Sequence, residues 1–345
     1  MTRPKRIACI LLPRFNMMGV VNLLEPLRIA NYLSDEPLYN HSFHAPDPGA
    51  IAASNGMEIA CTSLPTRLTR EDIICVAGSW GAENYDDATF LAWLRRQARL
   101  GIRLCAIEIG SYVFARAGLL AGRQATTHWS YLAGFQEKFP DILAVEQLFT
   151  IDGGIMTCAG STAACDLMLH LIQEDHGAPL VGEISDIMMH HPVRAGHAPQ
   201  RKTLGRGIDV LPDGVRAAIE LMESNITEPL RVPDIAGKVG ISQRQLERQF
   251  NQTIGCSVVQ FGMLLRLQHA RVLLISTDLS VREISAASGF NSLSHFAYAF
   301  RKCFDRRPSE YRQAWPEQED APSWPGTLAK YLDTLQVNQR MRAAN

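Results

Sequence analysis

Two similar segments near the C-terminus of this 345-residue chain constrain its fold more than any other feature. The first reads IAGKVGIS at 235–242 and the second reads ISAASGFN at 284–291. In each, an apolar residue and small residues precede a glycine, and an apolar and a polar residue follow it, as a helix-turn-helix requires. The two isoleucines and the two glycines are 49 positions apart, but Phe250 and Phe300 are 50 apart. The sequence therefore predicts two helix-turn-helix units, the second with a turn one residue longer.

A helix is predicted after each turn, because each stretch carries an apolar i,i+4 pair on one face. These pairs are Leu246 with Phe250, and Phe296 with Phe300. Capping-box patterns and prolines mark further helix starts, at Ser242–Gln245, Ser257–Gln260, Ser280–Glu283, Pro233 and Pro308. The apolar stretch 257–275 is long enough to form a helix between the two units.

The polar faces of the two predicted recognition helices carry Arg, Gln, Asn, Ser and His, which suit phosphates and base edges. Residues 201–313 hold 16 Lys and Arg against 11 Asp and Glu, whereas residues 1–200 hold 15 against 20. This concentration of positive charge favours a nucleic-acid partner. The alternative is an all-helical domain with two helical hairpins and no DNA.

Residues 212–315 resemble the DNA-binding domain of the AraC/XylS family of transcriptional regulators. The run FAYAFRKCFDRRPSEYR at 296–312 is close to the signature of that family. Asp305 stands where the family usually has glycine, and aspartate tolerates the left-handed backbone conformation better than most residues. The resemblance implies double-stranded promoter DNA as a partner, RNA polymerase as a second partner if the protein is an activator, and recognition helices entering major grooves roughly 34 Å apart.

The expected DNA contacts follow from the residues that the two units expose. We expect base-edge or nearby contacts from Gln243, Arg244, Arg248, Asn291, Ser294 and His295, with Ser242 in the same interface. Phosphate contacts are expected from Lys238, Arg271, Arg282, Arg301, Lys302, Arg306 and Arg307.

The first two hundred residues have the pattern of an α/β sandwich. Apolar runs at 7–12, 73–77 and 102–107 alternate with amphipathic helical stretches, which indicates buried parallel strands and crossover helices. The helical stretches are 20–33, 88–100 and 112–120, and strands at 147–151 and 154–158 precede a helix at 162–173. Glycines at 78, 81 and 110 mark the carboxyl edge of the sheet, where open α/β sheets bind ligands.

The run CAIEIGSY at 105–112 predicts a strand that turns abruptly into a helix at Glu108, the geometry of a nucleophile elbow. With the stretches 115–123, 125–129 and 157–160, this run resembles the class I glutamine amidotransferase-like superfamily of PfpI type, and more narrowly the sensor half of GlxA-type AraC regulators. The resemblance implies a flavodoxin-like α/β sandwich and a homodimer. Glu108 occupies the position of the superfamily's catalytic cysteine, and a carboxylate cannot perform thiolate chemistry. Cys105 lies on the opposite face of the strand.

We therefore expect a binding site rather than a catalytic one. Within the resemblance, Glu25 matches a glutamate that approaches the elbow, so Glu25 and Glu108 are expected to face each other across a small cleft. Two close carboxylates require a proton or a cation between them, and aromatic rings favour a cation. The expected ligand-binding residues are Glu25, Trp80, Glu108, Gly110, His128 and Trp129.

The predicted ligand is a small nitrogenous metabolite with an ammonium or quaternary ammonium group. Glu25 paired with Arg28, and tryptophans in the core or a dimer contact, are the alternatives. The alternative function is a hydrolase or amidotransferase-like enzyme with a DNA-binding appendage, which Glu108 disfavours.

The predicted organisation is a sensor domain at 1–193, a linker at 194–211, the DNA-binding domain at 212–315 and a flexible tail at 316–345, with a short helix at 327–342. Eight cysteines without a CxxC pair indicate buried free thiols of a reducing cytosol. His190, His191 and His197 lack further ligands at metal spacing and fit a domain junction better. We expect no metal, no cofactor, no membrane-spanning segment and a cytoplasmic location.

Overall fold

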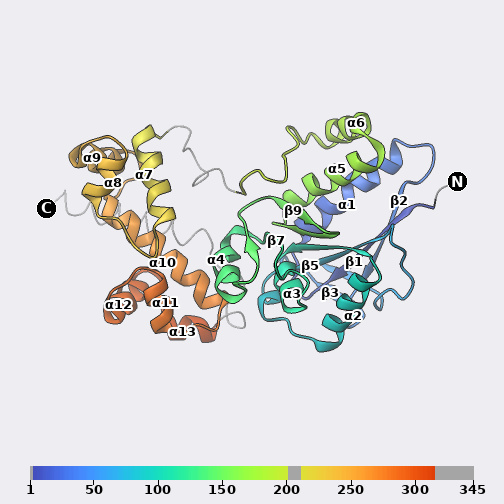
Figure 1. The fold of residues 1–345 in the computed structure, drawn as a ribbon, viewed down its shortest axis with the longest axis horizontal. Helices are drawn as coiled ribbons and strands as arrows, with labels where there is room; N and C mark the ends of the chain where they lie inside the picture. The colour runs from blue at the N-terminus through green and yellow to red at the C-terminus, as the bar shows by residue number, and fades with distance from the viewer. Residues whose placement is uncertain (1–2, 201–210, 315–345) are drawn as a thin grey trace. The chain divides into compact units, whose positions relative to one another are not determined.

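The computed structural model describes residues 3–200 and 211–314 (Figure 1). The chain divides into two compact units, Met1–Gln200 and Arg201–Asn345. The predicted tail and its helix at 327–342 lie outside the described residues.

The first unit contains a six-stranded sheet in the order β2-β1-β5-β6-β10-β9. The first five of these strands pair in parallel and β9 is antiparallel to β10. Their bounds are β1 (Lys5–Leu11), β2 (Tyr39–His44), β5 (Ile73–Gly78), β6 (Arg103–Glu108), β9 (Phe149–Asp152) and β10 (Ile155–Cys158). The flavodoxin-like α/β sandwich predicted from the sequence is confirmed.

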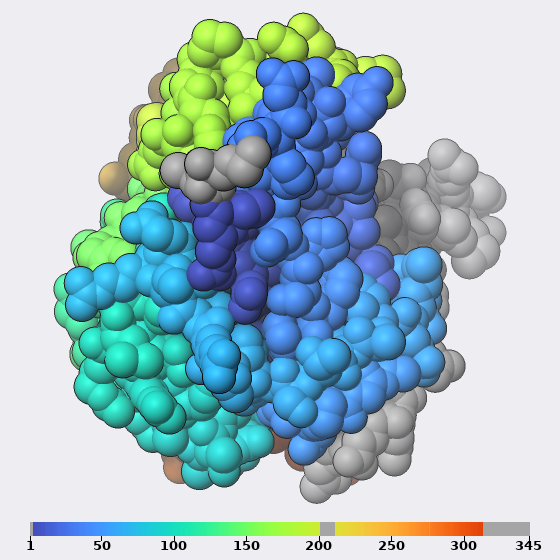
Figure 2. All heavy atoms as spheres, turned by 90° about the vertical axis from the view of Figure 1, so that its right-hand side faces the viewer, coloured from blue at the N-terminus to red at the C-terminus, as the bar shows by residue number. Residues whose placement is uncertain are grey.

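Helices cover both faces of this sheet, as Figure 1 shows. α1 (Met17–Tyr32), α5 (Ala163–His176) and α6 (Ala178–Met188) contact one another on one side, and α2 (Ala88–Arg99) contacts α3 (Gly110–Arg116) on the other. In Figure 2 the yellow-green region of α5 and α6 lies against the blue α1. Ile7, Cys9 and Leu11 of β1 join the cluster under α1, α5 and α6, and the alternate residues are buried as well. Burial on both faces explains the continuous apolar runs.

Several elements of this unit carry too weak a pattern to be predicted from the sequence. β3 (Gly49–Ala52) and β4 (Glu58–Cys61) form a short hairpin whose residues are exposed or half-buried apart from the buried Cys61. β7 (Gln124–Ala125) and β8 (Leu143–Ala144) have two residues each, and α4 (Trp129–Lys138) begins at a histidine cap. A 3₁₀ turn, η1 (Ala82–Asn84), follows β5.

The expected linker begins too early. Residues 194–200 pack on the first unit, where Arg194 bonds to Asp166 and Gln200 bonds to the loop before α4. The compact unit accordingly extends to Gln200 rather than to 193.

The second unit consists of helices among its described residues. They are α7 (Asp213–Ser224), α8 (Val232–Lys238), α9 (Gln243–Thr253), α10 (Val258–Ser276), α11 (Val281–Ala287), α12 (Leu293–Phe304) and α13 (Pro308–Ala314). All three predicted capping boxes form. Gly240 and Gly289 occupy the left-handed region at φ 74° and 73°, so each turn requires its glycine. The second turn is one residue longer, since α9 starts three residues after its glycine and α12 four.

α10 bridges the two helix-turn-helix units and is the longest helix of the second unit's described part. Val258–Ile275 is long and apolar enough to cross a membrane by length and composition alone, a test that a buried core helix also passes. The helix instead packs against α7, α9, α11, α12 and α13, which makes it the central core helix of the unit.

Candidate functional site

The turn from β6 into α3 is an elbow centred on Glu108. Glu108 has φ 59°, a strained value for a residue with a side chain. Its carbonyl oxygen accepts hydrogen bonds from Ser111 Oγ at 3.1 Å and Thr127 Oγ1 at 3.0 Å, which hold the turn. At Gly110, a Cβ would lie 2.5 Å from the carbonyl oxygen of Val76, so only glycine allows this close approach. The predicted elbow is present.

The Glu108 side chain is buried and only partly hydrogen-bonded. Ser79 Oγ donates to Oε1 at 3.2 Å, whereas Oε2 has no hydrogen-bond partner among the described residues. Burial raises the pKa of Glu108 to about 7, and the neighbouring polar side chains of Ser79 and Asn16 offset this rise only in part. The Asn16 amide itself donates to Ser161 Oγ at 3.4 Å. The elbow therefore presents a carboxyl group with a pKa near 7 and with one oxygen that no described residue hydrogen-bonds.

Loops from the carboxyl ends of several parallel strands meet around Glu108. Asn16 caps α1 after β1, Ser79 follows β5, and Gly160 follows β10, where an added Cβ would lie 2.7 Å from Glu108 Cβ. This is the edge at which open α/β sheets bind ligands.

The predicted facing pair of carboxylates is wrong. Glu25 forms an ion pair with Arg28 at 2.8 Å, the alternative that the sequence left open. α1 approaches the elbow through its first turn, where Gly19 lies against Ile107 and Ser161. Glu25 comes nine residues after Asn16, about 13 Å further along the helix axis at the rise of an α-helix. Of the predicted pair, Glu108 lies at the elbow and Glu25 does not.

The predicted aromatic and histidine residues lie within two positions of residues that hydrogen-bond to Glu108. Trp80 directly follows Ser79, and His128 and Trp129 directly follow Thr127, which bonds to the elbow carbonyl. All three are half-buried. His128 Nδ1 contacts Ser130 Oγ at 2.7 Å and caps α4, and its ring centroid lies 5.4 Å from that of Trp129.

Two cysteines near the elbow are poor nucleophiles. Cys105 belongs to the cluster beneath α1 and α5, away from the Glu108 side chain. Burial raises the pKa of Cys158 to about 12, so its thiol stays protonated.

Of the three histidines considered for metal binding, His190 and His191 each lie beside one carboxylate. His190 Nε2 lies 3.0 Å from Asp166 Oδ1, and His191 Nε2 lies 3.0 Å from Asp186 Oδ1. His197 is exposed on segment 194–200. No group of three or more His, Cys, Asp or Glu in the described part of the chain has metal-binding geometry.

The second unit presents the predicted DNA contacts on its surface. All ten residues are exposed: Lys238, Ser242, Gln243, Arg244, Arg248, Asn291, Ser294, His295, Arg301 and Lys302. Leu246, Phe250, Phe296 and Phe300 are fully buried, so each recognition helix turns its polar face outward. The Ser242 hydroxyl also caps α9, since its oxygen accepts from the Gln245 backbone N–H at 3.3 Å.

One predicted phosphate contact is wrong. Arg271 is 1% exposed in the core of the second unit, where its Nε donates to the Tyr311 hydroxyl. Its guanidinium also lies over the rings of Phe304 and Tyr311, at 5.5 Å and 5.4 Å from their centroids. Arg271 therefore holds α13 against α10 and cannot reach DNA.

Sequence reasoning missed Tyr298 and Arg266. Tyr298 is 68% exposed on α12, three residues after His295 and four after Ser294, so it shares their face. That helical spacing was readable from the sequence. Arg266 Nη1 donates to the Gly289 carbonyl at 3.1 Å, and its guanidinium lies 4.4 Å from the Phe290 ring centroid. This contact joins α10 to the second turn, and no local pattern signals it.

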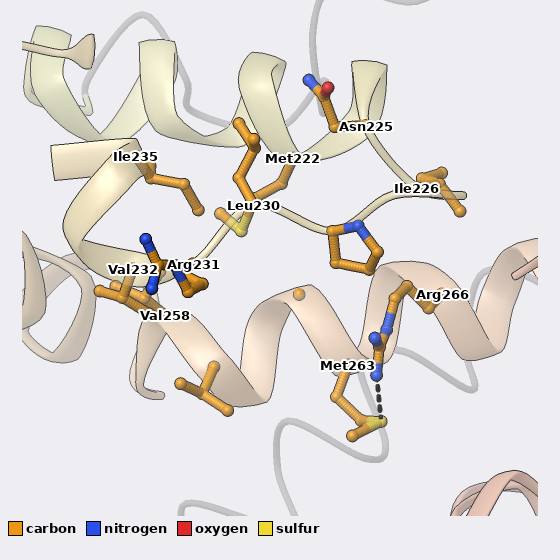
Figure 3. Close-up of a pocket in the computed structure, with 13 residues that line it drawn as sticks. Met222, Asn225, Ile226, Leu230, Arg231, Val232, Ile235, Val258, Met263 and Arg266 are labelled. Atoms are coloured by element: carbon orange, nitrogen blue, oxygen red, sulfur yellow. Dashed lines mark hydrogen bonds between the residues drawn. The ribbon is translucent and has the colours of Figure 1, made fainter. Parts of the chain in front are cut away.

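A hollow of about 240 Å³ lies between α7, α8 and α10. Figure 3 shows Met222, Leu230 and Ile235 opposite Val258 and Met263, with Arg266 at one end. The lining is mainly apolar, and Arg266 Nη2 contacts Met263 Sδ at 3.3 Å.

Comparisons with known proteins agree with the folds of both units. Residues 235–314 match a family model described as a helix-turn-helix domain, and residues 5–174 match the DJ-1/PfpI family. The HTH-type transcriptional regulator CdhR of Pseudomonas aeruginosa is 36% identical over 93% of this chain and 95% of its own length. GlxA of Rhizobium meliloti is 35% identical over 90% and 96%, and GbdR of Pseudomonas aeruginosa is 35% identical over 91% and 85%. The chain belongs to the AraC/XylS-type helix-turn-helix transcriptional regulators that carry an N-terminal DJ-1/PfpI domain, in the GlxA-type subgroup.

Proposed function

We propose that the first unit is a non-catalytic sensor whose elbow binds a small cationic nitrogenous metabolite and thereby controls DNA binding by the second unit. The observation that carries this proposal is Glu108, a buried carboxyl group at the position of a nucleophile whose Oε2 has no hydrogen-bond partner within residues 3–200 and 211–314. An ammonium or quaternary ammonium group would supply the missing charge, because a buried carboxylate is costly until it is paired.

The surroundings of Glu108 support a cation over an anion. Trp80 directly follows Ser79 and Trp129 comes two residues after Thr127, and both Ser79 and Thr127 bond to Glu108. Tryptophan is the aromatic side chain that best stabilises a cation through its ring face. His128 and Gly110 border the same elbow, and their contact with a ligand is part of the proposal.

Catalysis by this unit is not part of the proposal. The elbow carries a carboxylate, and Cys105 and Cys158 are buried, the latter with a raised pKa. The further elements of the proposed function are a cytoplasmic location, a homodimer formed through the first unit, and contact with RNA polymerase if the protein activates transcription.

For the second unit, the proposed DNA contacts are the ten exposed residues on and around α9 and α12, together with Arg282, Arg306 and Arg307. The two recognition helices would enter successive major grooves.

The experiment is a calorimetric titration of the full-length protein with choline and with 3,3-dimethyl-1-butanol, which replaces the nitrogen of choline by carbon. The pair differs in charge but hardly in shape. Binding of choline alone, lost in Glu108→Gln and kept in Glu25→Gln, is the expected result. Equal binding of both compounds, or binding unchanged in Glu108→Gln, would contradict the proposal.

A further inference from the structure

The segment by which the chain leaves the first unit, residues 194–200, is held at three places. Arg194 makes two side-chain bonds to Asp166 Oδ2, at 3.0 Å and 2.5 Å. The carbonyl oxygens of Gly196 and Ala198 both accept from the Leu148 amide at 3.0 Å. The third place is the side chain of Gln200, the last residue of the compact unit.

Gln200 inserts its amide into the loop that precedes α4. Its Oε1 accepts from the Trp129 backbone amide at 2.7 Å. Its Nε2 lies 2.7 Å from the Thr127 carbonyl, 2.9 Å from the Gln147 carbonyl and 3.0 Å from Thr126 Oγ1. The orientation of the amide is fixed, since the Trp129 N–H can only donate and the two carbonyls can only accept. Both ends of the Gln200 amide therefore make hydrogen bonds to the first unit.

Thr127 connects this contact to the elbow. Its carbonyl oxygen accepts from Gln200 and its hydroxyl donates to the Glu108 carbonyl. The next residues in the chain are His128 and Trp129. A single residue thus separates Glu108 from the end of the segment that leads to the DNA-binding unit. Arg194 and Gly196, by contrast, bond to Asp166 of α5 and to Leu148 and Phe149 at the start of β9.

We propose that Gln200 is the residue through which occupancy of the elbow controls the segment leading to the DNA-binding unit. This inference rests on the proposed function, because it assumes that the elbow binds a ligand. A ligand between Glu108 and the loop 126–129 changes the position of Thr127 and Trp129, and hence the stability of the Gln200 contact. A ligand shifts such an equilibrium only by its difference in affinity for the two states, and the coupling acts equally in both directions.

The test compares full-length wild type with Gln200→Ala, Gln200→Glu and His197→Ala. Gln200→Glu keeps the acceptor for Trp129 but places an oxygen against two carbonyls, so it removes the donor side alone. His197 is exposed on the same segment and has no part in the contact, which makes His197→Ala the matched control. The DNA is a duplex selected by the wild-type protein from a random library, and the added compound is choline.

Two readouts separate the failure of this inference from failure of the proposed function. The first is DNA affinity without any ligand. Both Gln200 variants are expected to shift the dissociation constant about fivefold, the change that one hydrogen bond of typical strength produces, while His197→Ala stays at the wild-type value. The second is amide hydrogen exchange at 126–129, which should accelerate in Gln200→Ala.

Wild-type DNA affinity in both Gln200 variants, with faster exchange at 126–129, would overturn the inference, because the contact would then be broken without consequence for DNA. The response of wild type to choline is scored separately. Its absence would count against choline-like cations at the elbow, whereas the ligand-free comparison would still decide the role of Gln200.

Discussion

The replacement Glu108→Gln tests most quantitatively whether the elbow holds a buried carboxyl group with a raised pKa. Burial raises the pKa of Glu108 from 4.5 to about 7. A carboxyl group whose folded pKa is raised stabilises the fold fully below the unfolded pKa, and this contribution is lost as the pH rises through the folded pKa. The shift makes the wild-type first unit about 2–3 kcal/mol less stable at pH 8 than at pH 5. A neutral glutamine removes this dependence, so the variant should become the more stable protein at pH 8.

Urea unfolding followed by tryptophan fluorescence measures this difference. Trp80, Trp93 and Trp129 lie in the first unit, so Trp315 and Trp324 are replaced by phenylalanine in all proteins compared. Glu25→Gln is the control, since Glu25 is a half-exposed glutamate paired with Arg28. If Glu108→Gln shows the same change in stability between pH 5 and pH 8 as wild type, the assignment of a buried, titrating carboxyl group to the elbow is refuted.

Three further outcomes are expected. Choline should bind about tenfold more weakly at pH 6 than at pH 8, because only the ionised form of Glu108 pairs with a cation and its pKa is about 7; calorimetry at both pH values checks this. Arg301→Ala should weaken binding to all DNA sequences and reduce the salt slope by about one, whereas Arg244→Ala should change base preference; unchanged preference in a selection experiment would show that the position of α9 is misassigned. Arg266→Ala removes the bond to Gly289 and the contact with Phe290 that join α10 to the second turn. Affinity should therefore fall about tenfold for duplexes that carry the sites of both recognition helices, and hardly change for duplexes that carry only one of these sites. Anisotropy titrations on the two kinds of duplex compare these values.

The second unit could be predicted almost completely from its sequence. Its information is local: each capping box joins residues three apart, and each turn depends on one glycine. The structure confirms the boxes at Ser242, Ser257 and Ser280 and the left-handed turn at Gly289. Asp305 likewise has φ 57°, as expected for the residue in the place of glycine.

Arg271 shows where local reasoning fails. Its charge predicted a phosphate contact, but its partners come from much later in the chain: Phe304 of α12 lies 33 residues after it and Tyr311 of α13 lies 40 residues after it. Burial of a charged residue by distant partners has no signature in the nearby sequence.

The candidate ligand site could be predicted only in part, because some of its geometry is local and some depends on residues distant in the sequence. The elbow at Glu108 is a local strand-to-helix turn, and the structure confirms it. The position of Glu25 depends on the registration of α1 against the sheet, and here the expected alignment was wrong. Gln200 had no visible role in the sequence, because its partners lie 53 to 74 positions away.

The central claim is that one chain reads two successive turns of DNA in response to a ligand at the elbow. The most direct measurement is hydroxyl-radical footprinting of full-length protein on its selected duplex, with and without choline. We expect two protected windows one helical turn apart for each chain bound, with a concentration for half-protection that choline changes in wild type but not in Glu108→Gln. A single window, or half-protection that choline leaves unchanged in wild type, would contradict it.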